Sequence, residues 1–323
     1  MDKAKVSGSC CNILVVIPVK NEEKFIKECL LSVFNQDFAK GKIFVVVVDN
    51  GSTDKTCEIV LGFGDKVTLL EHPEGTIASL RNFGACSQNS DLVAFLDGDC
   101  VAPSNWLSTG YKILMEDELV ACVGFTAAKP GLNASWVARV WHDMCSCSKY
   151  SGTLQVVWVS SFNLLLRREM FLQVGGFDES LVTCEDYDLG VRLSQQYKVI
   201  FSDIISVAHL GVVDGIKEFF AKELWRGKNN LQSFIKDKFS IGSFLGVAAP
   251  VYQLVATFLF FLNFLCQLMP LWFSLIIWCI IPLLMTLRKI SKMNWYNSLR
   301  IFFLYNVYLL ARGLAIFEAT WKK

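Results

Sequence analysis

Two aspartates separated by one glycine, Asp97 and Asp99, directly follow an apolar run at residues 92–96 that is typical of a buried strand. Gly98 allows a tight turn, so the two carboxylates lie on one short loop. Hard divalent cations such as Mg²⁺ and Mn²⁺ prefer oxygen ligands and often share them with the phosphates of a substrate. The pair therefore predicts a divalent metal bound with a nucleoside diphosphate, although an isolated pair of this kind is more often a solvated turn.

Polar side chains also follow two other apolar runs. After residues 13–17 come Pro18, Asn21 and Glu22, and after residues 43–48 come Asp49 and Asn50. Residues 67–70 are a further apolar run, and helix starts are expected at 21–23, near Thr53 and at Thr76. Continuous apolar strands that alternate with helices predict a parallel α/β sheet covered on both faces. Ligands of such sheets bind beyond the carboxyl ends of the strands, where these polar residues lie.

The second half of the chain carries a second acidic group. Glu185 and Asp186 open an expected helix, and acidic residues there also favour the helix dipole, so a structural role stays open. Residues 217–238 form a basic, aromatic and amphipathic stretch. Strands are expected at residues 156–159, 163–167, 198–201 and 205–209.

Taken together, these motifs resemble the family 2 glycosyltransferases of the GT-A fold. They occur in the order of that family and cover roughly residues 12–230. The resemblance implies a GT-A domain, an α/β fold with a Rossmann-like mixed sheet, followed by C-terminal transmembrane helices. The matching segments are Ile17-Pro18-Val19-Lys20-Asn21-Glu22, Val48-Asp49-Asn50-Gly51-Ser52-Thr53-Asp54, Arg81-Asn82-Phe83-Gly84-Ala85, Asp97-Gly98-Asp99, Gly175-Gly176-Phe177-Asp178, Glu185-Asp186 and Trp225-Arg226-Gly227.

The resemblance implies a donor-binding set for a nucleotide sugar, with UDP preferred over GDP or dTDP. Glu22 and Asp49 would accept hydrogen bonds from the ribose and the base, and Arg81 would lie near the phosphates. Glu22 is also a helix-capping residue by its position, Asp49 a turn residue, and Arg81 a surface helix residue. The full implied set is Pro18, Asn21, Glu22, Asp49, Asn50, Arg81, Asp97, Trp225 and Arg226.

The resemblance also implies a metal and a general base. Asp97 would face the ribose or a Mn²⁺ or Mg²⁺ ion, Asp99 would bind the ion, and His209 would help to hold it, unless His209 is purely structural. Asp186 would take the proton of the acceptor hydroxyl, and Glu185 would position the acceptor. The reaction expected of the family inverts the configuration of the sugar. Because the Gln-x-x-Arg-Trp element of processive synthases is missing, transfer of a single sugar is expected.

Two other functions stay open at this point. The acceptor is expected to be a polyprenyl-linked lipid or glycan in polysaccharide assembly, but a polyprenyl phosphate is an alternative, for which residues 217–238 supply basic side chains. A catalytically inactive membrane scaffold that binds nucleotide sugar is the second alternative. Nucleic-acid binding is not expected, because the body before residue 239 holds 24 Lys and Arg against 29 Asp and Glu.

The composition favours a membrane protein. Hydrophobic residues make up 53% of the 323 residues, charged residues 19%, and the mean hydropathy is +0.40. Residues 239–287 contain no Asp, Glu, Lys or Arg. This run is too long for one crossing of a bilayer core of about 30 Å and fits a hairpin with spans near 244–265 and 270–287. A C-terminal stretch, Ala311-Arg312-Gly313-Leu314, resembles the tail of bacterial polysaccharide-assembly members.

The charges that flank the hairpin predict its orientation. Residues 288–300 carry four basic residues and no acidic residue, so they are expected to face the cytoplasm. A hairpin returns the chain to the same side, which predicts a cytoplasmic catalytic domain at residues 1–238 and a multi-pass cell-membrane region at 239–323. The third apolar segment, 299–317, either spans the bilayer or lies in the interface with Arg312 turned toward protein.

Overall fold

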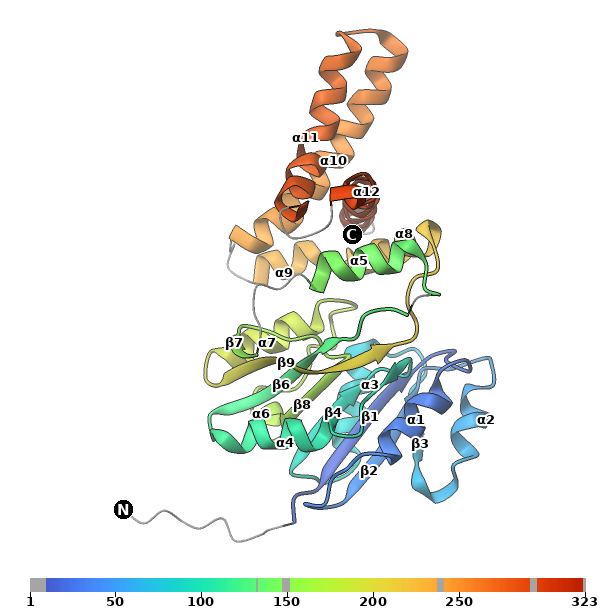
Figure 1. Ribbon diagram of the computed structural model, residues 1–323, viewed down its shortest axis with the longest axis vertical. Helices are drawn as coiled ribbons and strands as arrows, with labels where there is room; N and C mark the ends of the chain where they lie inside the picture. Colours follow the sequence, from blue (N-terminus) through green and yellow to red (C-terminus); the bar gives the residue numbers. More distant parts are fainter. Residues whose placement is uncertain (1–9, 132, 147–151, 237–240, 291–294, 322–323) are drawn as a thin grey trace. The chain divides into compact units, whose positions relative to one another are not determined.

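The chain forms two compact units (Figure 1). The computed structural model describes residues 10–131, 133–146, 152–236, 241–290 and 295–321. Unit 1 comprises Met1–Ala128 and Tyr150–Gly211, and unit 2 comprises Lys129–Lys149 and Val212–Lys323. The boundary predicted at residue 238 lies outside the described residues and stays a prediction, while the contacts group the preceding basic stretch with unit 2.

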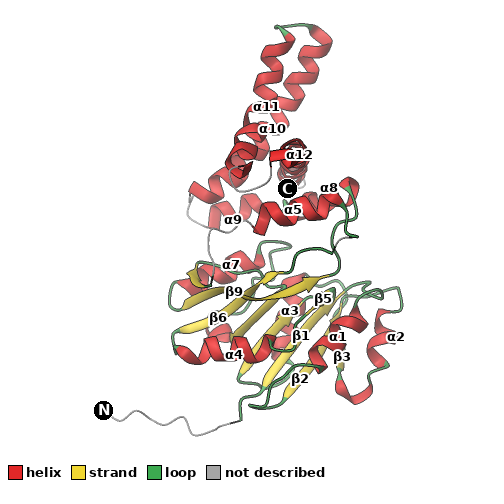
Figure 2. Ribbon diagram, viewed as in Figure 1, coloured by secondary structure: helices red, strands yellow, loops and turns green. Residues whose placement is uncertain are grey.

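Within the described residues of unit 1, nine strands form one mixed sheet (Figure 2). The order is β3-β2-β1-β4-β8-β6-β9-β5, and β7 pairs with β9. The parallel arrangement predicted from the first half holds for β1 to β4, whereas β8 is antiparallel to β4 and β6. The strands are β1 (Ile13–Val19), β2 (Ile43–Asp49), β3 (Thr68–Glu71), β4 (Leu92–Leu96), β5 (Cys100–Val101), β6 (Val120–Ala127), β7 (Thr153–Val156), β8 (Asn163–Arg167) and β9 (Lys198–His209).

Helices cover both faces of this sheet, as continuous apolar strands require. Side chains alternate along β1: Ile13, Val15 and Ile17 pack with α1 and α4, while Leu14 and Val16 pack with α3 and α7. All seven residues of β1 are buried, so the strand forms the centre of both cores. The helices are α1 (Ile26–Phe34), α2 (Thr56–Leu61), α3 (Ile77–Cys86), α4 (Trp106–Glu116), α6 (Arg168–Gln173) and α7 (Glu185–Ser194).

The predicted strand at 156–159 is wrong. The strand found, β7, ends at Val156 because its partner residues on β9 end at Val199. Residues 198–209 form one strand instead of the two expected, with a register shift against β6 between Phe125 and Thr126. Helix α1 begins at Ile26 rather than at residues 21–23, after a turn in which the backbone carbonyl of Glu22 accepts hydrogen bonds from the N–H groups of Phe25 and Ile26.

Unit 2 consists of helices in its described residues. Helices α5, α8 and α12 share a core that includes Val140, Phe219 and Leu304. Helices α10 and α11 form a hairpin near the predicted spans, and the Asn263 amide donates to the Ser274 hydroxyl at 3.0 Å beside its turn. The bounds are α5 (Trp136–Ser146), α8 (Ile216–Arg226), α9 (Asn230–Lys236), α10 (Ile241–Cys266), α11 (Leu271–Ile290) and α12 (Ser298–Trp321).

Three helices of unit 2 are long and apolar enough to cross a membrane. They contain Phe244–Cys266, Leu271–Lys289 and Ser298–Glu318. The apolar window of α12 is 50% buried within the protein, against 17% for each of the other two. Arg312 on α12 turns toward protein, where its guanidinium binds the fully buried carboxylate of Glu223 on α8 at 2.9 Å.

Candidate active site

The parallel pairing of β1 and β2 brings the ends of these two strands to one edge of the sheet. Val19 lies opposite Asp49 in the register, and the backbone N–H of Asn50 donates to the carbonyl of Val19 at 2.9 Å. Pro18 is the residue opposite Val48. The first two predicted donor-binding loops are therefore neighbours.

Asn21 connects the loops that follow β1 and β2. Its backbone has a φ of 58°, which Asn tolerates better than most residues. Its backbone N–H donates to the Ser52 hydroxyl at 2.9 Å, and its side-chain oxygen accepts from the N–H of Thr53 at 2.8 Å. Since Asn21 makes these local bonds, it shapes the donor-binding loops, and direct contact with a donor stays a prediction.

The carboxylate of Asp49 is buried and only partly used. Oδ2 accepts a hydrogen bond from the N–H of Ser52 at 2.9 Å. Oδ1 is buried and has no hydrogen-bond partner among the described residues. An orphaned buried acceptor costs free energy, so this oxygen fits a ligand that brings an N–H or O–H donor. Beside it, the Asn50 amide donates to the carbonyl of Gly75 at 2.6 Å.

The loop after β4 lies against the loop after β1. A Cβ added at Gly98 would lie 2.8 Å from a methyl of Val19 and 3.4 Å from Cγ of Glu22. Glycine at position 98 is therefore favoured by this close approach, whereas its backbone lies outside the left-handed region and the turn itself does not require glycine. The close approach brings Glu22 beside the loop that carries Asp97 and Asp99.

Arg81 joins two predicted site carboxylates. Its Nη2 binds Oδ1 of Asp97 at 2.8 Å, and its Nη1 binds Oε1 of Glu185 at 2.8 Å. Arg81 is 3% exposed, so it is not the surface residue that its helix position alone allows. The two carboxylates more than offset its burial and raise its pKa, which keeps the guanidinium charged. Arg81 thus holds the Asp-x-Asp loop and the start of α7 together.

Asp186 follows Glu185 in the first turn of α7 and is half-buried. Burial first, and then the adjacent charge of Glu185, raise the pKa of Asp186 to about 7 against the lowering effects of the Tyr187 N–H and of Arg81. A carboxyl with a pKa near neutrality exchanges protons easily at physiological pH, as a general base must. The raised pKa is compatible with the role of general base, which stays a prediction for Asp186.

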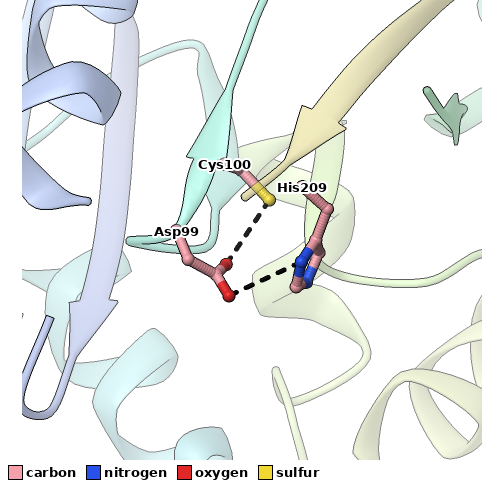
Figure 3. A group of neighbouring side chains, drawn as sticks. All are labelled: Asp99, Cys100 and His209. Atoms are coloured by element: carbon pink, nitrogen blue, oxygen red, sulfur yellow. Dashed lines mark hydrogen bonds and ion pairs between the residues drawn. The ribbon is translucent and has the colours of Figure 1, made fainter. Parts of the chain in front are cut away.

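Asp99 and His209 meet through the pairing of β5 with β9. Cys100 lies opposite His209 in that antiparallel pair, and Oδ2 of Asp99 lies 3.5 Å from Nδ1 of His209 (Figure 3). The Cys100 thiol donates to Oδ1 of Asp99 at 3.7 Å, and the three residues form the group that could hold a metal within the described chain. Burial, and then the charges of Asp97 and Asp99, raise the pKa of the Cys100 thiol.

The metal set predicted from sequence was Asp97, Asp99 and His209. The structure brings Asp99 and His209 together, while Asp97 binds Arg81. Cys100 joins this group, and sequence reasoning missed it. The only signal for it was its position directly after Asp99, which says nothing about its neighbour on β9.

Trp225 and Arg226 lie on α8 in unit 2, so their predicted role in donor binding stays a prediction. The indole of Trp225 is exposed, and the guanidinium of Arg226 binds Oε1 of Glu223 at 2.7 Å.

Residues 14–175 match the family model described as "Glycosyl transferase family 2". Among curated relatives, glycosyltransferase AglE of Haloferax volcanii is 28% identical over 235 residues, which cover 71% of this chain and 76% of AglE. Hyaluronan synthase of Pasteurella multocida is 25% identical over 214 residues, which cover 62% of this chain and 22% of that enzyme.

Solved structures show the same fold. The mannosyltransferase PcManGT from Pyrobaculum calidifontis, in complex with GDP-Man and Mn²⁺, gives a TM-score of 0.64 at 16% identity and covers 98% of this chain and 88% of its own. TarS 1-349 of Staphylococcus aureus gives a TM-score of 0.53 at 17% identity, and the match covers 97% of this chain and 92% of the TarS chain. These neighbours confirm the predicted GT-A fold. Because the family model spans half of the chain and the sheet is that of these enzymes, the protein belongs to glycosyl transferase family 2.

Proposed function

We propose that this glycosyltransferase moves one sugar from a nucleoside diphosphate donor to a membrane-linked acceptor, with inversion at the anomeric carbon and with the help of a divalent cation. The observation that carries the proposal is the Arg81 bridge, which gathers Asp97 and Glu185 next to Asp186. It joins the end of a donor-binding strand to the first turn of the helix that offers the base.

The donor end of the site supports a nucleotide ligand. The buried Oδ1 of Asp49 lacks a hydrogen-bond partner among the described residues and fits a donor group of a base or ribose. UDP-sugars are the first candidates and GDP-sugars the second. Among the structural neighbours, PcManGT is in complex with GDP-Man and TarS 1-349 with UDP.

Asp99, just before β5, and His209, at the end of β9, fit a divalent cation. A Cβ added at Gly211 would lie 2.1 Å from Oδ2 of Asp99, so only glycine fits against this carboxylate. Asp99 and His209 would hold the ion, which when bound would supply positive charge to the leaving diphosphate. Mn²⁺ and Mg²⁺ are the candidates, and the PcManGT neighbour holds Mn²⁺.

In the proposed reaction Asp186 accepts the proton of the acceptor hydroxyl. The freed oxygen then attacks the anomeric carbon on the face opposite the nucleoside diphosphate, which inverts the configuration as that group leaves. Glu185 is held by Arg81 at 2.8 Å and keeps the first turn of α7 in position.

We place the apolar helices of unit 2 in the cell membrane and the catalytic unit on its cytoplasmic side, with a polyprenyl-linked lipid or glycan as the acceptor. The three apolar helices and the basic residues in the last turn of α11, Arg288 and Lys289, support this placement. A cysteine introduced at the exposed Gln267, in a background without native thiols, should react with an impermeant reagent from outside. If a cysteine introduced at Ile290 reacted from outside and the one at Gln267 did not, the proposed topology would be contradicted.

A panel of UDP-, GDP- and dTDP-sugars with and without Mn²⁺ tests the activity, scored by thermal shift and by donor hydrolysis. A response to one nucleotide that depends on Mn²⁺ supports the proposal. The absence of a response to every donor would contradict it.

A further inference from the structure

The Cys100 thiol faces one carboxylate oxygen of Asp99 and the His209 imidazole faces the other, so that the three side chains lie close enough to converge on one small cation (Figure 3). With zinc–sulfur at about 2.3 Å and zinc–oxygen or zinc–nitrogen at about 2.0–2.2 Å, ligand atoms lie roughly 3.3–3.7 Å apart. The observed separations are 3.7 Å between the Cys100 sulfur and Oδ1 of Asp99, and 3.5 Å between Oδ2 of Asp99 and Nδ1 of His209. All three ligand atoms lie within 4.8 Å of one another.

The group is shielded on the sulfur side and accessible on the histidine side. Cys100 is 0% exposed, whereas the side chains of Asp99 and His209 are 15% and 31% exposed. A cation at this point can therefore take three protein ligands and keep a fourth position for water or phosphate. Structural zinc sites fill all four positions with protein, and this group resembles the open kind.

The chemical mixture of ligands favours a soft cation over a hard one. Thiolate and imidazole ligands select Zn²⁺ and its neighbours, while Mg²⁺ and Mn²⁺ prefer oxygen. The Irving–Williams order also places Zn²⁺ above Mn²⁺ at a site of this type. On binding, the cation would take the place of the thiol proton, which is released to solvent.

We propose that Asp99, Cys100 and His209 bind one thiophilic divalent cation, zinc being the ion that fits, and that zinc bound there excludes Mn²⁺ and inhibits transfer. Asp99 and His209 are shared with the proposed site for the hard cation, and Cys100 is the additional ligand that gives zinc the advantage. The binding part of this inference stands without the proposed function, and only the inhibition part rests on it.

Cobalt(II) is the probe for the binding part, because thiolate-bound Co²⁺ shows a sulfur-to-metal charge-transfer band in the near ultraviolet. The full chain, titrated with one equivalent of Co²⁺, should show this band, and one equivalent of Zn²⁺ should abolish it. X-ray absorption of the zinc-loaded protein should show one sulfur at about 2.3 Å with nitrogen or oxygen ligands at about 2.0–2.2 Å.

Cys100→Ser should remove both the cobalt band and the sulfur shell. The matched control is Cys122→Ser, which changes an equally buried thiol on β6 and should keep both signals. Zinc affinity should fall about 100-fold or more in Cys100→Ser, since losing even an outer-shell partner costs roughly 10–100-fold. X-ray absorption of the zinc-loaded parent protein needs no variant. A spectrum with only nitrogen and oxygen ligands would overturn the inference.

Inhibition is measured separately, as the loss of Mn²⁺-supported transfer on addition of Zn²⁺. The parent protein should be inhibited at lower zinc concentrations than Cys100→Ser, when each is scaled to its own activity without zinc. Equal inhibition of both proteins would overturn the inhibition part. If no donor supports transfer, the proposed function fails, and the cobalt and absorption measurements still decide the site.

Discussion

Arg81 and Glu185 form a buried ion pair, with 2.8 Å between Nη1 and Oε1, that joins α3 to α7. The side chains are 3% and 10% exposed, so water screens the pair weakly. Arg81 also binds Asp97, which means that one guanidinium balances two carboxylates. The positions of Asp97 and Glu185 therefore depend on a single cation.

Replacing Arg81 by Met should destabilise unit 1 by about 3–5 kcal/mol, because it leaves the buried carboxylate of Glu185 without its partner. Denaturant unfolding followed by tryptophan fluorescence measures the change. Lys198→Met is the matched control, since its pair with Asp117 is exposed to solvent and should contribute little to stability. Similar losses in both variants would show that Arg81 does not hold the site together.

Asp186→Asn should keep donor binding and reduce transfer by about 10²–10⁴-fold, which is the usual contribution of a general base. Donor affinity is measured by calorimetry and transfer by product formation. Asp188→Asn, on the same helix, removes a carboxylate that pairs with Arg192 and should change transfer far less. A loss below about tenfold in Asp186→Asn would contradict the assignment.

The raised pKa of Asp186 sets the direction of the pH dependence. Transfer, measured as kcat/KM, should rise with pH through about 7, as the carboxyl loses its proton and becomes able to act as a base. Stability should change in the opposite direction. The folded state keeps a proton that the unfolded state releases, so this group stabilises the fold less as pH rises from about 4 to about 7. Asp186→Asn should flatten that stability slope, and an unchanged slope would assign the titration to another group.

Asp99→Ala should abolish the Mn²⁺ dependence of donor binding, and EDTA should have the same effect on the parent protein. The reason is that Asp99 supplies the carboxylate nearest to His209. Donor affinity with and without Mn²⁺ is the measurement, and Asp203→Ala, which removes a carboxylate that binds the Gly152 N–H, is the control. Full activity of the parent protein in EDTA would remove the metal from the reaction.

Glu223 is fully buried between Arg226 and Arg312, and this arrangement predicts a second sensitive position. Glu223→Ala should destabilise unit 2 by about 3–5 kcal/mol, since it leaves the guanidinium of Arg312 without its carboxylate. Thermal unfolding in detergent measures the loss. The double variant with Arg312→Leu should recover part of that stability, and no recovery would mean that the two side chains act independently.

Sequence patterns predicted the strands well where burial alone decides them. The bounds expected for 92–96 and 163–167 are those of β4 and β8, because β4 is a continuous buried apolar run and β8 is a run of three buried leucines between Asn163 and Arg167. The strand expected at 156–159 was displaced because β7 is defined by the residues of β9 that it pairs with. A partner strand distant in the chain leaves no local signal.

The site residues likewise divide into those placed by local sequence and those placed by a partner distant in the chain. Asp49 ends β2 and Asp99 lies shortly after β4, so their place at one edge of the sheet was predictable from the parallel topology. The contact of Cys100 with Asp99 and His209 was not, because it requires β5 to pair with β9. The two ion pairs of Arg81, with Asp97 and with Glu185, were not predictable either. A helical sequence pattern does not show which carboxylates from other parts of the chain lie beside the helix.

The short pairing of β5 with β9 has a consequence for folding. Two residues on each strand close a loop that includes much of unit 1, so the contact gains few hydrogen bonds for a large loss of chain entropy. Contacts of this kind form late, after the local parts of the sheet. A cation that binds only the paired strands would slow local opening there and raise the melting temperature in proportion to the logarithm of its concentration. The cation-binding residues would then also stabilise the pairing of β9 with β5.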